Sequence, residues 1–140
     1  MKVSAGGADR TAAADEPASV DQSVAPPLVP VEHSIDLAHL ARMTLGEPSL
    51  EREVLSLFDR QAAMLLARMG NAPPAVAAAL AHTLKGSARG IGAWKVAEAA
   101  EGVEGLTAQA GAVTLAQAVD RLSASVTEAR AAIVELLRRY

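Results

Sequence analysis

The C-terminal part of the chain carries apolar residues at alternating spacings of four and three, namely Leu115, Val119, Leu122, Val126, Ala129, Ile133 and Leu136. This spacing places an apolar stripe on one face of a helix, and the stripe must pack at a shallow angle against neighbouring helices. The aromatic content argues against a β-sandwich or barrel core, since the 140 residues include one Trp, one Tyr and one Phe. Most apolar residues are therefore Ala, Leu and Val, and a composition rich in the helix formers Ala and Leu favours an all-α fold.

Four further segments have helical spacing and are separated by Gly or Pro. A short helix is predicted between the possible caps Ser34 or Asp36 and Gly46, and it carries Ile35, Leu37, Leu40 and Met43. A second is predicted from Pro48 or Ser49 to about Gly70, with an inward stripe of Leu50, Val54, Leu57, Phe58, Met64 and Leu65. A third should begin at Pro73 and end near Ile91, and a fourth should span about 93 to 106 or 107, with Val96, Ala100 and Val103 inward. Short connections make successive helices antiparallel, so the sequence predicts an up-down four-helix bundle with a short extra N-terminal helix.

Residues 1–33 differ from the rest of the chain. They hold four of the seven prolines, and their other residues show no helical spacing. Such a segment buries too little apolar surface to offset the entropy lost on ordering. We therefore expect a disordered Pro/Ala-rich tail over residues 1–33, either an inert leader or a docking segment, and one folded domain over residues 34–140.

Composition excludes several classes of function. The chain has no Cys, which excludes a disulfide framework, a thiolate zinc site and thiol catalysis. Its net charge of −3 lacks the basic excess of a nucleic-acid-binding surface. No apolar run is long enough to span a membrane, and the N-terminus shows no apolar signal-peptide core. The expected protein is cytoplasmic and binds neither nucleic acid nor membrane.

The third predicted helix presents a histidine away from its apolar face. On a helical wheel of residues 73–91, the side chains within about 60° of the pole opposite His82 are Val76, Ala77, Leu80, Leu84, Ser87, Ala88 and Ile91. Those within about 60° of His82 are Ala75, Ala78, Ala79, Lys85, Gly86 and Arg89. His82 is therefore expected to point to solvent from a patch of small residues flanked by two cations.

The neighbours of His82 point to chemistry on the imidazole. Gly86 lies one turn further on the same face, and a mid-helix Gly costs about 1 kcal/mol relative to Ala, so its use indicates close approach of another surface. Lys85 is spaced so that its ammonium can reach the ring. No second His or carboxylate stands at metal-ligand spacing on this helix. An exposed imidazole is mostly unprotonated at neutral pH, so the reaction best matched is attack on an activated phosphoryl group brought by a partner.

The run His82-Thr83-Leu84-Lys85-Gly86-Ser87-Ala88, followed by Ile91-Gly92-Ala93, resembles the signature of histidine-containing phosphotransfer (HPt) domains of multistep two-component phosphorelays. Small and apolar residues and one acid continue the family pattern at its spacing, namely Val96, Ala99, Ala100, Val103 and Glu104. The resemblance covers residues 82–104, and the helical pattern of residues 34–140 agrees with the four-helix fold of the family.

The resemblance implies that His82 accepts a phosphoryl group from a receiver-domain aspartyl phosphate and passes it to another receiver aspartate. Lys85 would neutralise the phosphoryl oxygens, and Gly86 would leave room for the partner. The partners would be response-regulator receiver domains or a hybrid histidine kinase, and Mg²⁺ would belong to the receiver, so this chain needs no cofactor or metal of its own. The protein would be a monomeric phosphocarrier without ATP-dependent kinase activity.

The residues expected to bind the partner are Ala78, Ala79, Gly86, Arg89, Gly90 and Gln61. Arg89 stands where the family often has Ala or Gly, so it could tune the choice of partner, clash with some receivers or be a solvated surface residue. Gln61 could hydrogen-bond the imidazole or be a plain surface residue. Three acids follow at intervals of three, Glu98, Glu101 and Glu104, and we expect a solvated stripe rather than an acid–base pair. His33 and His39 are expected on the surface.

Two other functions remain open at this stage. A helical adaptor could dock receivers without turning over phosphate, and it would not need His82. A histidine-kinase fragment is disfavoured because Thr83 follows His82 where such hairpins carry Glu or Asp, and because no ATP-binding segment is present.

Overall fold

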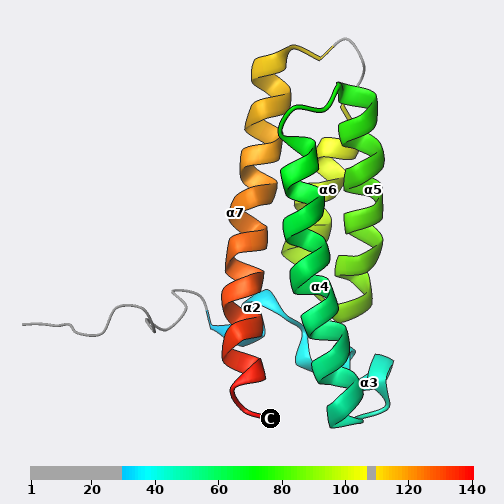
Figure 1. Ribbon diagram of the computed structural model, residues 1–140, viewed down its shortest axis with the longest axis vertical. Helices are drawn as coiled ribbons and strands as arrows, with labels where there is room; N and C mark the ends of the chain where they lie inside the picture. The colour runs from blue at the N-terminus through cyan, green and yellow to red at the C-terminus, as the bar shows by residue number, and fades with distance from the viewer. Residues whose placement is uncertain (1–29, 107–109) are drawn as a thin grey trace, which may run out of the picture.

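The structure of the protein is a computed structural model and describes residues 30–106 and 110–140. Within these ranges the chain forms α2 (Val31–Ser34), α3 (Leu37–Thr44), α4 (Pro48–Met69), α5 (Pro74–Ile91), α6 (Trp94–Glu104) and α7 (Ala112–Leu137). Helices α4 to α7 run alternately up and down as a four-helix bundle, with α2 and α3 toward its lower end (Figure 1). The predicted all-α, antiparallel bundle is confirmed. No helix in the described part of the chain is long and apolar enough to cross a membrane.

The four long helices close into a ring. Helix α4 packs against α5 and α7, and α6 packs against the same two helices from the other side. The short helices lie on the outside, α2 against α7 and α3 against both α4 and α5. This arrangement leaves an outer face on α5 between its neighbours α4 and α6, and His82 is part of α5.

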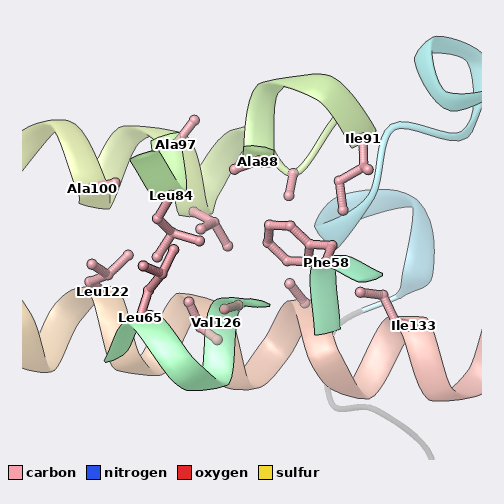
Figure 2. Close-up of a cluster of buried hydrophobic side chains, with 14 of the residues drawn as sticks. Phe58, Leu65, Leu84, Ala88, Ile91, Ala97, Ala100, Leu122, Val126 and Ile133 are labelled. Carbon is pink, nitrogen blue, oxygen red and sulfur yellow. The ribbon is translucent and has the colours of Figure 1, made fainter. Parts of the chain in front are cut away.

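The core lies between the four long helices and consists of aliphatic side chains around one aromatic ring, that of Phe58. Figure 2 shows side chains from all four helices meeting there, among them Leu65, Leu84, Ala100 and Val126. The stripe predicted on the last helix is confirmed, since its members from Leu122 onward are buried. The inward positions predicted on α6 are also buried, and their small side chains let α5 and α6 approach closely.

The inward stripe predicted for the second helix is half wrong. Phe58 and Leu65 are buried, but Leu50, Leu57 and Met64 are 38%, 54% and 51% exposed. The bundle instead covers an arc of α4 that is turned further round and includes Leu55, Ala62 and Met69. Val76 of α5, also predicted inward, is exposed. The error arises because α4 is apolar over a wider arc than its two neighbours can cover.

The N-terminal part differs from the single short helix predicted. Ser34 ends α2 instead of capping a helix, and Ile35 is a fully buried, extended link between α2 and α3. Asp36 is the true cap of α3, since its carboxylate accepts the His39 backbone N–H at 3.0 Å. Met43 is exposed rather than inward, and the helix ends before Gly46 as predicted. Helix α2 starts at Val31, inside the predicted 1–33 tail, whereas residues 1–29 of that tail lie outside the described residues.

A clasp of side chains joins α3 to the turn between α5 and α6. The indole N–H of Trp94 donates to the Asp36 carboxylate at 2.9 Å, and the rings of Trp94 and His39 meet edge to face. The Nε2–H of His39 donates to the backbone carbonyl of Arg89 at 2.9 Å. His39 is thus a bound, half-buried group rather than the plain surface residue that we expected. The clasp fixes the end of the helix that carries His82.

Gly92 ends α5 and is required there for two reasons. Its φ is +79°, a left-handed conformation that favours glycine, and a Cβ would lie 2.9 Å from the Asp36 Cβ.

We expect Gly92→Ala to lower the free energy of unfolding by about 2–4 kcal/mol, because backbone strain adds to the clash with Asp36. Chemical denaturation measures this, with Gly102→Ala as control. A Cβ at Gly102 would meet nothing within 4 Å, so that helical substitution should raise stability by about 0.5–1 kcal/mol. Equal changes in the free energy of unfolding for Gly92→Ala and Gly102→Ala would contradict the clash at Gly92.

Candidate functional site

His82 lies in the middle of α5 with its side chain 68% exposed, as the helical wheel predicted. The opposite face of the helix is buried in the core through Leu80, Leu84 and Ala88. The exposed position of the imidazole is therefore fixed by the same residues that anchor α5. An imidazole presented in this way can be reached by a group on another protein.

Glu104, at the end of α6, holds one nitrogen of the ring. Its Oε2 lies 2.6 Å from the His82 Nδ1. An ionised carboxylate can only accept a hydrogen bond, so Nδ1 carries the proton, and in the neutral ring the lone pair is on Nε2. The contact thus selects the tautomer and fixes the ring plane, and Nε2 is the nitrogen available for attack.

The other oxygen of Glu104 binds Lys85. The Lys85 Nζ lies 2.5 Å from the Glu104 Oε1, an atom that is covered from solvent, and only 13% of the Lys85 side chain is exposed. The ammonium of Lys85, and after it the bond to His82, hold the pKa of Glu104 below its usual value of 4.5. The carboxylate is therefore ionised at neutral pH. Because the folded-state pKa is lowered, the stability that this pair contributes is present above pH 4.5 and is lost as the pH falls below it.

The expectation that Glu104 belongs to a solvated stripe is wrong, because its carboxylate joins His82 to Lys85. Glu98 and Glu101 are exposed, as expected of such a stripe. The sequence signal that could have singled out Glu104 is its place in the family pattern, since periodicity alone treats the three acids alike.

Two glycines, Gly86 and Gly90, leave open space on the surface beside His82. A Cβ at Gly86 or at Gly90 would meet nothing within 4 Å, so the fold itself does not require glycine at either position. Ala79 is exposed and Ala78 is half-buried. The two glycines cost helix stability without relieving a clash, which is understandable if another surface comes close here.

Comparison with known proteins identifies the family of the chain. The family model of the Hpt domain matches residues 53–132, more than half of the chain, from the first turns of α4 into α7. The chain belongs to the Hpt domain family. Hpt domains serve histidine phosphotransfer in two-component phosphorelays and interact with receiver domains. No curated protein and no solved structure matches the chain.

Gln61 does not contact the imidazole in this Hpt domain. Its Oε1 accepts the hydroxyl of Ser87 at 2.7 Å, and this bond ties α4 to α5. Ser87 was expected on the buried face and is half-buried. Gln61 thus supports the scaffold beside the site, and the imidazole has Glu104 as its partner instead.

Sequence reasoning missed an apolar rim on the side of α4 that adjoins α5, formed by Leu57 and Met64. On the wheel of α4 both lie within about 60° of Gln61, which faces α5, and away from Asp59, which binds Arg130 of α7 at 2.6 Å. About half of each side chain is exposed. The rim therefore borders the His82 face of the Hpt domain and was hidden in the sequence because both residues were assigned to the core.

The described residues give no sign of a metal centre. Within 30–106 and 110–140, no three His, Asp or Glu side chains gather as metal ligands would.

Proposed function

We propose that this Hpt domain is a phosphorelay intermediate in which His82 takes a phosphoryl group from the aspartyl phosphate of one receiver domain and passes it to the aspartate of another. The observation that carries the proposal is the imidazole held through Nδ1 by Glu104 with its other nitrogen turned to solvent. This arrangement prepares a nucleophile and supplies no group for making the phosphoryl donor. The partner must therefore bring the phosphoryl group already activated.

The transfer balances without any further reactant. The Nε2 lone pair forms the N–P bond as the bond from phosphorus to the aspartyl oxygen breaks, and the aspartate leaves as a carboxylate. The proton on Nδ1 stays in place, so the phosphorylated ring is cationic, and the Glu104 carboxylate 2.6 Å away stabilises that charge. The reverse step onto a second receiver uses the same contacts. Mg²⁺ would be held by the receiver.

Lys85 serves the reaction from a fixed position. Its ammonium has three donors, so it can bind Glu104 with one and still present another to a phosphoryl oxygen. Because the Lys85 side chain is mostly buried, its ammonium is held in one place and does not move freely in solvent. Lys85 would thereby offset the negative charge of the phosphoryl group without releasing the carboxylate.

The receiver would dock on the face that combines the glycines, the small side chains of α5 and the apolar rim. Gly86 and Gly90 let its backbone approach, and Leu57 and Met64 offer apolar surface on the adjoining side of α4. All of these residues come from one chain, so a monomer can carry out the transfer.

The proposal is tested by mixing the protein with a phosphorylated receiver domain and Mg²⁺ and following the phosphoryl group. We expect a label that is lost in acid and kept in base, as expected for a phosphohistidine, and peptide mapping should place it on His82. A label on His33 or His39, or a receiver that docks and never transfers, would overturn the proposal. ATP in place of the receiver serves as the negative control.

A further inference from the structure

Arg89 is a charged residue of the His82 face that the transfer chemistry does not use. It follows His82 by seven residues, two helical turns, which places it about 10 Å further along α5 on the same side. Its side chain is exposed. A helical side chain leans toward the N-terminus of its helix, so the guanidinium can extend over Gly86, which has no side chain of its own, toward His82.

The charge of Arg89 is uncompensated, in contrast to that of Lys85. Lys85 is paired with the Glu104 carboxylate at 2.5 Å. No carboxylate of residues 30–106 or 110–140 forms an ion pair with Arg89. Arg89 therefore offers an incoming surface a positive charge that no described carboxylate offsets.

The backbone that carries Arg89 is held firmly. Its carbonyl accepts the Nε2–H of His39 at 2.9 Å, and the next turn is closed by Gly92. A cation in the last turn of a helix also interacts favourably with the helix dipole, so part of the role of Arg89 is in stability. That role needs a cation near the helix end, but it does not need one on the face of His82.

We propose that Arg89 determines which receivers this domain serves, by pairing with an acidic side chain on the part of the docked receiver that faces Gly86 and Arg89. This inference rests on the proposed function. A charge at the rim of an interface changes mainly the rate of association and the dependence of that rate on salt. A like charge at the facing position on the partner repels it and so disfavours that partner. Receivers with a neutral or basic residue at that place would be poor partners.

The test compares Arg89→Gln, Arg89→Glu and Arg89→Lys with wild type against a panel of phosphorylated receivers at low and high salt. For the preferred receiver at low salt, we expect Arg89→Gln to lower the second-order transfer rate about 5–10-fold and Arg89→Glu to lower it further. The transfer rate of Arg89→Lys should stay within about threefold of the wild-type rate. High salt should reduce the differences in transfer rate between wild type and all three variants. Arg121→Gln, an exposed change of equal charge on α7, is the matched control and should have little effect.

Two more measurements separate the possible outcomes. Labelling of His82 by the small donor phosphoramidate needs no docking and should be the same in all variants. A receiver whose acidic residue is replaced by Lys should recover transfer with Arg89→Glu. Unchanged rates in Arg89→Gln, an equal loss in Arg121→Gln, or a loss that also affects phosphoramidate labelling would each overturn the role of Arg89 while transfer to His82 stands. A wild type that phosphoramidate labels but no receiver does would overturn the proposed function, and the Arg89 proposal with it.

Discussion

Replacing His82 by alanine is expected to abolish phosphoryl transfer from a receiver, with a loss of more than about 10³-fold, because the variant lacks the attacking nitrogen. No other imidazole can take over. The Nε2–H of His39 is bonded to the Arg89 carbonyl, and His33 belongs to α2, which packs against α7. The measurement is the transfer rate from a phosphorylated receiver, with exposed His33→Ala as the matched control that should keep the wild-type rate.

The same variant separates a relay from an adaptor. The His82 side chain is mostly exposed, and Glu104 keeps Lys85 as its partner when the ring is gone, so the change in stability should stay within about 0.5 kcal/mol. Receiver binding should therefore persist within a few-fold while transfer is lost. If His82→Ala instead supports the full cellular response of the wild type, docking alone is the function, and the relay is contradicted.

The exposure of His82 could be predicted from the sequence because α5 has a narrow, well-marked apolar face. Leu80, Leu84 and Ile91 fix its orientation, and the His follows from the 100° step of the helix. The same reasoning failed on α4, where apolar residues cover a wider arc. Leu57 and Phe58 look equally suited to a core, and only the positions of α5 and α7 decide that Phe58 is buried and Leu57 is not.

The partner of His82 could not be read from periodicity for a related reason. Glu104 is 22 residues away on another helix, and its approach depends on the tight α5–α6 turn at Gly92 and on the close packing of those two helices. Spacing along one helix carries no information about that crossing. The role of Asp36 likewise depends on a contact with Trp94, 58 residues later in the chain.

Removing the carboxylate that holds the ring is expected to have the second-largest effect. We expect Glu104→Ala to lower the transfer rate about 10–100-fold, the usual loss when a group that orients a reactive histidine is removed. Glu104→Gln should lose less, about 3–10-fold, because its amide oxygen can still accept from Nδ1–H although it cannot neutralise Lys85. Glu101→Gln, an exposed acid three residues earlier on α6, is the matched control.

A loss of rate alone would not distinguish positioning from loosening of the α5–α6 seam, so the tautomer of His82 must be measured as well. The ¹⁵N shifts of the ring should report a protonated Nδ1 in wild type and Glu104→Gln, and a shift toward protonated Nε2 in Glu104→Ala, where the nucleophilic lone pair is lost from the exposed nitrogen. The difference in unfolding free energy between wild type and Glu104→Gln should also shrink as the pH falls below 4.5, because protonation removes the same charge. If Glu104→Ala transfers slowly but keeps the wild-type tautomer, the carboxylate does not orient the imidazole. Its role is then to bind Lys85 and to hold α5 and α6 together.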